Sequence, residues 1–439
     1  MGANKKRTTW ERIRKLFQTI HLWMGLTSGI VVVAICLSGT IYVFNTELTE
    51  MSAPKLYKVN PVAGVQRISP ENLLTSINKH FSGNVTAIYV PSALNRTYRF
   101  DVKKQGDKSR SGTSYFVNPY SGDIVGTSLE KNSTKEFMST LFSLHRWLLL
   151  DKIEKPIFTG ITNRELGSKI TGWTTIIFTL GCLTGIIIWF PKKLRHWRQG
   201  LKIKASGNWK RLNHDLHNAP AFYALIFLLL MGITGPQWSF DWYRNGLQKT
   251  LGTYQPKKTN DKKKSSPGKT SNETKKLTTP LPLSDILKNA DQQLSYKGDY
   301  TIRFPEEQGD PVAITKNKTG FFAPAAGDKI MADAGNGTIL KTEIFKNKPF
   351  NERAAGSIKA LHTGSVYGIF TKCLYFFACL VATTLPVTGT IIWINKLKKR
   401  RKRLKKNSNG CSYHGIRMIP KMSSWRSDQG QVEMKQAFL

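Results

Sequence analysis

Residues 21–44, HLWMGLTSGIVVVAICLSGTIYVF, contain an uncharged apolar run that is long enough to cross a lipid bilayer as one helix. The run itself, Leu22–Phe44, is longer than the apolar core of a cleavable signal peptide, and no small-residue cleavage site follows it. Three further apolar runs are 170–190, 219–240 and 367–394, with Lys372 as the one charged residue. The sequence therefore predicts an α-helical integral membrane protein with four transmembrane helices.

The distribution of charge predicts the orientation of these helices. The chain of 439 residues has 66 Lys and Arg against 28 Asp and Glu, and a net charge of +38 suggests a nucleic-acid partner at first. However, the N-terminus 1–21, the loop 191–218 and the tail 395–439 together hold 27 basic and 4 acidic residues. The positive-inside rule places all three, and hence both termini, in the cytoplasm. Most of the excess charge is thus an orientation signal that also attracts anionic membrane lipid, and no nucleic-acid partner is expected.

Two long segments, 45–169 and 241–366, are then expected on the other side of the membrane as α+β domains. Neither contains a cysteine, so no disulfide framework is available there. For the first domain we expect a helix from Ser69, as N-cap, to Phe81. Its expected strands are 86–90, 98–103, 114–118 and 123–125. For the second domain we expect a helix at 283–294, strands at 300–304 and 312–316, and a disordered insert at 255–276.

Ordered matches between the two halves of the chain predict a tandem repeat. The matched pairs are His21 with His217, Ser38-Gly39 with Thr234-Gly235, Thr184–Trp189 with Thr388–Trp393, 118–122 with 333–337, and His145 with His362. Each half consists of a span, a domain and a span, so both halves have the same orientation. Chance similarity of apolar segments is the alternative, and the order of the matches disfavours it. We expect a parallel repeat about an axis along the membrane normal.

Four of the eight histidines form repeat-equivalent pairs near the membrane faces. His21 and His217 are expected at the cytoplasmic face. His145, in the apolar segment 137–150, and His362 are expected at the outer face. A single histidine at a helix end is often merely interfacial, but two equivalent ones at each face suggest paired ligands. Since neutral imidazole is a common axial ligand of haem iron, two bis-histidine haems are the hypothesis, one for each leaflet.

His214 is an alternative to His217 as a ligand, because the two are three residues apart on one helix. The repeat offset aligns His217 with His21, whereas His214 aligns with Gln18, which favours His217. Two histidines without carboxylate or cysteine partners make a poor structural zinc site. The glycines within the spans have two explanations, close helix packing or room for a flat macrocycle, and the sequence does not separate them.

The order of these motifs resembles the PepSY-associated transmembrane family over roughly residues 10–400. The segments that carry the resemblance are His21–Gly25, Leu144–Leu149, His214–His217 and Leu361–Gly364, together with the Thr-Gly span endings and the turn Asn118–Asp123. The resemblance implies a bacterial inner-membrane protein with two periplasmic PepSY-like domains. It also implies similarity to ferric-siderophore reductases with two b-type haems. By matching position, His21 and His217 would hold one haem, and His145 and His362 the other.

The resemblance leads to a haem-dependent oxidoreductase as the first functional hypothesis. An electron would pass from the cytoplasmic-side haem to the outer haem, and then to a ferric siderophore or another periplasmic acceptor. No catalytic acid, base or nucleophile is required. Because we find no G-x-G-x-x-G after a strand and no P-loop, the electron donor would be separate, a quinol or a soluble reductase.

Two other functions compete with electron transfer. PepSY domains are associated with peptidase inhibition, so the outer domains could bind peptides, modulate peptidases or sense the envelope without any enzymatic activity. A transporter with sites between the repeats is the weaker alternative, because no span is interrupted around a buried acid.

Overall fold

The computed structural model describes residues 8–81, 83–104, 106–107, 112–191, 194–256, 283–305 and 310–412. The predicted disordered insert, 255–276, lies outside these residues from position 257 onward. Contacts divide the chain into two compact units, 1–390 and 391–439, and the arrangement described below is that of the first unit.

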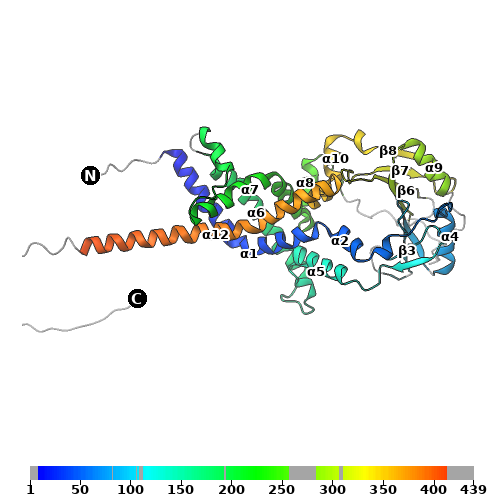
Figure 1. Ribbon diagram of the computed structural model, residues 1–439, viewed down its shortest axis with the longest axis horizontal. Coiled ribbons are helices and arrows are strands. Elements are labelled where there is room, and N and C mark those ends of the chain that lie inside the picture. Colours follow the sequence, from blue (N-terminus) through cyan, green and yellow to red (C-terminus); the bar gives the residue numbers. More distant parts are fainter. Residues whose placement is uncertain are drawn as a thin grey trace, which may run out of the picture. The chain divides into compact units, whose positions relative to one another are not determined.

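Four helices in the described part of the chain are long and apolar enough to cross a membrane (Figure 1). They are α1 (Thr9–Tyr42), α6 (Asn163–Trp189), α7 (Trp209–Thr234) and α12 (Gly368–Ser412). Three of them begin well before the apolar run that predicted them, because a polar side chain caps the first turn. The capping residues are Thr8, Thr162 and Asn208, which accept hydrogen bonds from the backbone N–H groups of Glu11, Glu165 and Arg211.

The one charged residue in the fourth apolar run is paired. Lys372 Nζ lies 2.6 Å from Glu47 Oε1, which belongs to helix α2 (Asn45–Ser52). Only 13% of the Lys372 side chain is exposed, so an unpaired ammonium here would be costly. The ion pair thus explains how the fourth run tolerates a lysine.

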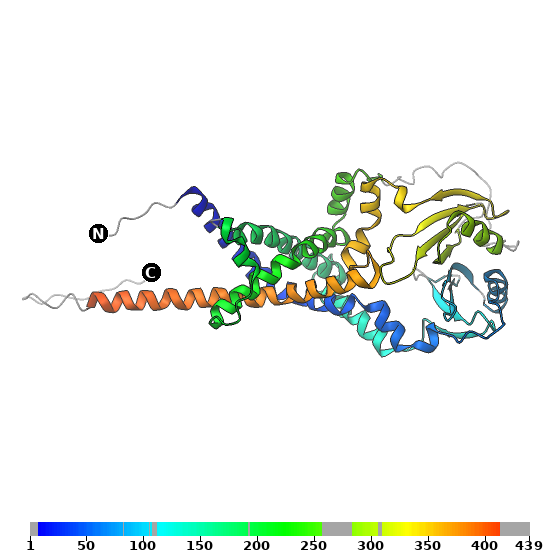
Figure 2. The ribbon, with the colours of Figure 1, turned by 45° about the horizontal axis from the view of Figure 1, so that its top comes forward.

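One antiparallel sheet of eight strands is built from both of the long segments, in the order β4-β3-β2-β1-β5-β6-β7-β8. The first segment contributes β1 (Asn84–Val90), β2 (Tyr98–Lys103), β3 (Thr113–Val117) and β4 (Ile124–Thr127). The second contributes β5 (Gly298–Arg303), β6 (Val312–Lys318), β7 (Asp328–Ala332) and β8 (Ile339–Glu343). Figure 2 shows the first group in blue to cyan and the second in green to yellow. Strands β7 and β8 were not predicted.

The two groups of strands are joined where β1 pairs with β5. Ile88 pairs with Ile302 across this join, and both side chains are fully buried. The register is the same on either side, because Ile88 pairs with Phe100 just as Ile302 pairs with Ile314, 214 residues further along. The two long segments, which the sequence predicts as separate domains, therefore share one sheet and one core.

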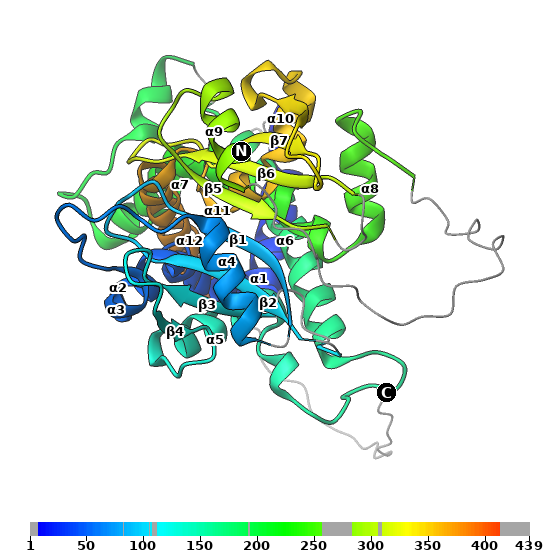
Figure 3. The ribbon, with the colours of Figure 1, turned by 90° about the vertical axis from the view of Figure 1, so that its right-hand side faces the viewer.

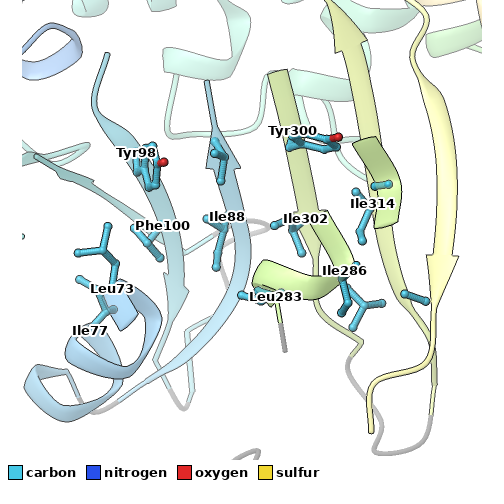
Figure 4. Packing of buried hydrophobic residues seen from close by; sticks show 14 of the residues in the cluster. Leu73, Ile77, Ile88, Tyr98, Phe100, Leu283, Ile286, Tyr300, Ile302 and Ile314 are labelled. Carbon is cyan, nitrogen blue, oxygen red and sulfur yellow. The ribbon is translucent and has the colours of Figure 1, made fainter. Parts of the chain in front are cut away.

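Two helices cover one face of this sheet. α4 (Pro70–His80) and α9 (Leu283–Gln293) lie on the same side of the strands (Figure 3), close to the predicted helical ranges. They bury apolar residues between helix and sheet, as Figure 4 shows for Leu73, Ile77, Ile88, Phe100, Leu283, Ile286, Ile302 and Ile314. The other face carries more polar strand side chains, such as Arg303 and Asn317, since strand side chains alternate between faces.

Shorter helices connect the sheet with the long helices. They are α3 (Pro54–Tyr57), α5 (Ser133–Trp147), α8 (Asp241–Thr250), α10 (Phe350–Gly356) and α11 (Ile358–Thr363), with the 3-10 turns Leu150–Lys152, Gly235–Trp238 and Phe345–Asn347. A further 3-10 segment, Leu194–Leu201, lies between α6 and α7. Helix α5 ends abruptly, because Leu148 and Leu149 both have left-handed backbone conformations, at φ 54° and 63°. Such a conformation costs about 1–2 kcal/mol for each non-glycine residue, so surrounding contacts must hold it.

Helix α6 packs closely against the end of α5, just before these two leucines. A Cβ atom at Gly167 would overlap the backbone of Trp147, the last residue of α5. Next to it, Thr171 Oγ1 donates a hydrogen bond of 3.0 Å to the carbonyl oxygen of Arg146. Gly167 therefore lets α6 lie directly against the end of α5, two residues after His145.

We predict that Ile302→Ala lowers the free energy of unfolding by about 2–5 kcal/mol, because it leaves a cavity at the join between the two groups of strands. Ile124→Ala is the matched control, since Ile124 is also a strand residue but is 41% exposed. Thermal unfolding of the two purified variants measures the difference. Equal stability of both variants would show that the contact between β1 and β5 contributes little to the stability of the protein.

Gly167→Ala is expected to lower the melting temperature strongly, or to prevent folding, since backbone atoms of Trp147 cannot move aside as a flexible side chain can. Gly181→Ala in the same helix is the control, because a methyl group added there would have no neighbour within 4 Å. Gel filtration of detergent extracts after heating compares the two. Similar melting temperatures would contradict the close approach of α5 and α6.

Candidate functional site

The rings of His21 and His217 face each other between α1 and α7. Their centroids are 6.4 Å apart and the ring planes are nearly perpendicular, at 85°. Two imidazoles that bind one iron at about 2 Å through opposite nitrogens have centroids about 6 Å apart. The spacing therefore leaves room for one metal ion that both rings would bind.

In each ring of this pair Nδ1 is already occupied by a neighbouring helix. His21 Nδ1 lies 3.1 Å from the carbonyl oxygen of Gly181 and 3.0 Å from Thr184 Oγ1, both on α6. His217 Nδ1 lies 2.9 Å from Thr388 Oγ1 on α12. These two threonine hydroxyls donate to carbonyl oxygens of their own helices, so they accept from the histidines. Nδ1 is therefore the protonated nitrogen, and Nε2 carries the free lone pair.

His145 and His362 form a second pair of the same kind. The ring centroids of His145, on α5, and His362, on α11, are 6.1 Å apart with the planes at 66°. His145 Nδ1 donates to the carbonyl oxygen of Ile35 at 2.9 Å, and His362 Nδ1 donates to Thr234 Oγ1 at 3.1 Å. The hydroxyl of Thr234 in turn donates to Leu230, so the proton assignment follows as in the first pair. Burial lowers the pKa of both histidines, which lie outside the four long helices.

A glycine lies at the Cε1 edge of each of these four rings. Added Cβ atoms would stand 3.2–3.5 Å from Cε1, at Gly39 against His145, Gly185 against His21, Gly235 against His362 and Gly389 against His217. Each of these glycines follows a serine or threonine, and three of the four hydroxyls accept from the ring beside them. The sequence offered two explanations for glycines in the spans. The structure adds a third, because these four make room for the ring edges.

The donor set fits haem better than it fits a metal ion held by side chains alone. Among the described residues no group of three or more His, Cys, Asp or Glu side chains is placed to hold a metal ion. Each pair offers two neutral imidazole nitrogens, which suffice when a macrocycle supplies the remaining ligands. In addition, a Cβ atom added at Gly25, one turn after His21 on the same helix face, would have no neighbour within 4 Å. The residues present are therefore compatible with haem.

His214 lies apart from the first pair. Its side chain is 55% exposed, and its ring contacts Asn218 and Asp215. The structure thus brings His217, and not His214, to His21. His80 is a surface residue of α4 whose Nδ1 lies 2.8 Å from the carbonyl oxygen of Ser76. The side chain of His196 and all of His414 lie outside the described part of the chain.

Two residues beside the second pair were missed by sequence reasoning. The Trp238 ring lies 4.9 Å from the His362 ring and is 40% exposed. Arg146, which follows His145, donates to Ser239 Oγ at 3.0 Å and to the carbonyl oxygen of Trp238. The segment after Gly235 therefore lies against His362 and against Arg146, the residue that follows His145. The position of Arg146 next to a candidate ligand was the one signal for it in the sequence.

A separate cavity of about 350 Å³ lies on the polar face of the second group of strands. Its lining is mixed in charge and includes Arg303, Asn317, Lys329, Glu343 and Lys348. Hydrogen bonds from Lys341 and Lys348 lower the pKa of Glu343 to about 2, so its carboxylate remains ionised at any ordinary pH. This cavity shares no residue with the two histidine pairs.

Comparison with known proteins assigns the chain to a family. The family model of the PepSY-associated TM region matches residues 18–396, a range that includes the four apolar runs and both histidine pairs. No curated protein matches the sequence. The chain belongs to the PepSY-associated transmembrane family.

Proposed function

We propose that this protein carries electrons across a membrane through two b-type haems, one bound by His21 and His217 and the other by His145 and His362. The observation that carries the proposal is the repeated pairing of neutral histidines at centroid distances of 6.4 and 6.1 Å. In both pairs each Nδ1 atom has a hydrogen-bond partner on another helix, which leaves Nε2 as the nitrogen for a bond to iron.

The haems, when bound, would supply a reversible one-electron iron couple. The chain's own residues fix the ligands. Hydrogen bonds to Nδ1 hold each ring in one orientation and one tautomer, and such partners make the imidazole a stronger ligand. Leu228 and Ala382 belong to a buried apolar cluster formed by the long helices. This arrangement suits transfer of electrons and leaves proton chemistry to other groups.

The tandem repeat accounts for the symmetry of the proposed sites. Each pair takes one histidine from each half of the chain, and the matching register across the β1–β5 join supports the duplication. We propose a bacterial inner-membrane location with both termini in the cytoplasm. His21 and His217 would then lie toward the cytoplasm, and the eight-stranded sheet would be periplasmic and PepSY-like.

Ferric siderophore is the proposed outer acceptor, with a quinol or a soluble reductase as the separate donor. Reduction lowers the charge on iron and so weakens its attraction to the hard oxygen ligands of a chelate. Iron release would follow from the electron alone.

The cavity on the second group of strands favours a second candidate function, in which the sheet binds a peptide or another periplasmic ligand. Its mixed lining of lysine, arginine and glutamate could recognise the backbone and side chains of such a ligand. In that case the histidine pairs would be structural, and the purified protein would be colourless.

Reduced-minus-oxidised absorbance of the purified protein tests the first proposal. We expect a b-type spectrum, and we expect that His145→Ala and His217→Ala each remove about half of the haem, because each variant breaks one of two sites. His214→Ala is the control and should retain the full content. Colourless protein from cells well supplied with haem would reject the proposal. Loss of haem in His214→Ala, together with a normal haem content in His217→Ala, would show that His214 is the ligand in place of His217. The rest of the proposal would stand.

The proposed orientation predicts which positions a membrane-impermeant maleimide can reach. In a variant without native cysteines, Ser121→Cys should react in intact spheroplasts, whereas Ser206→Cys should react only after lysis. Both positions are exposed in the structure, so access depends on the side of the membrane. The opposite labelling pattern would reverse the proposed orientation, with His145 and His362 toward the cytoplasm.

A further inference from the structure

Arg14, near the start of α1, has a buried polar atom that no described part of the chain satisfies. Its Nη2 donates to the carbonyl oxygen of Ile188 at 2.7 Å, at the end of α6. Its Nε, however, is buried and has no hydrogen-bond partner among the described residues. A buried donor without a partner costs about 1–3 kcal/mol, and more when it is charged, so such an atom in a native protein calls for an explanation.

The position of Arg14 relates it to the first histidine pair. Arg14 precedes His21 by seven residues, which is two helical turns, or about 10 Å along the same face of α1. Both side chains contact α6, Arg14 at Ile188 and His21 at Gly181 and Thr184. The guanidinium group of Arg14 and the ring of His21 therefore both lie against α6, with Arg14 nearer the start of α1.

The repeat provides a second cation at the corresponding place. Lys210 precedes His217 by seven residues on α7, as Arg14 precedes His21 on α1. Lys210 is exposed, so its long side chain can reorient. Two cations, one from each half, thus stand at the same distance along the helix from the two ligand rings.

We propose that Arg14 binds a propionate carboxylate of the haem held by His21 and His217, with Lys210 beside the second propionate. The inference rests on the proposed haem site. A haem has two anionic carboxylates on one edge, and a guanidinium group is well suited to bind a carboxylate through paired N–H donors. This contact would give the orphaned Nε its partner, and it would turn the carboxylate edge of the haem toward the basic N-terminus of α1.

The competing explanation is that Arg14 only caps the end of α6 through Ile188. A cap would contribute to the stability of the protein, but it would not distinguish a haem with free carboxylates from one without them. The decisive probe is therefore haem dimethyl ester, in which both propionates are esterified and uncharged.

The experiment uses the full chain with His145→Ala, which leaves the first site alone, or with His362→Ala if that variant does not fold. Apoprotein is loaded with haem or with haem dimethyl ester, and release to excess apomyoglobin is followed by absorbance. We expect the ester to leave about tenfold faster or more, as loss of one charge-assisted hydrogen bond requires. Equal release rates of haem and of its dimethyl ester would overturn the proposal. This comparison needs no variant of Arg14.

Variants of Arg14 test whether this residue causes the difference in release rate between haem and its ester. Arg14→Gln should release haem faster than the parent protein does, and esterification should speed release from Arg14→Gln less than from the parent, because only the Lys210 contact is then left to lose. Arg14→Lys should lie between the two, because the charge remains and the paired geometry is lost. Arg12→Gln removes an exposed charge from another face of the helix and should behave like the parent.

The outcomes separate this inference from the function on which it rests. A bis-histidine spectrum with the same haem release from Arg14→Gln and Arg12→Gln would overturn the role of Arg14 and leave the haem site intact. Failure of the parent protein to bind haem at all would overturn both.

Discussion

The hydrogen bond to Nδ1 of each paired histidine is the interaction on which the proposed site depends. In three of the four cases a threonine hydroxyl of a neighbouring long helix accepts this bond, and in the fourth a backbone carbonyl of α1 does. Each bond locks a ring to a helix other than its own. The positions of the four rings are therefore set by the packing of the helices, and the close approaches at Gly39, Gly185, Gly235 and Gly389 serve the same end.

Much of this arrangement could be predicted from the sequence, because apolar length and repeat offset are local properties. The four apolar runs indicated the four long helices, and the matched positions of His21 and His217 indicated that they meet. His217, and not His214, lies beside His21 in the structure, while the ligand itself stays a prediction. What each ring contacts could not be predicted. The Thr-Gly pairs were visible as repeat matches, yet only the crossing of the helices shows that Thr184 and Thr388 serve histidines on different helices.

The sheet shows where sequence patterns are weaker. Two separate domains were expected, and β7 and β8 were missed, since strands of five residues that include charged side chains have little signal of their own. The pairing of β1 with β5 joins residues more than 200 positions apart, and no local pattern specifies such a contact. The repeat between the two halves of the chain is the feature that could have predicted this pairing. Bulges recur at Phe116/Val117 and at Met331/Ala332, as expected if the two halves share one ancestor.

The β1–β5 join also sets a limit on how the chain can be divided. A fragment ending after α6 would keep His21 and His145 but neither of their partners, and its strand β1 would present an open edge of unpaired backbone groups. Such a fragment could become complete only by associating with a second copy of itself or with the missing half. The molecule is thus organised like a dimer whose two subunits have been fused, in which neither subunit possesses a whole site.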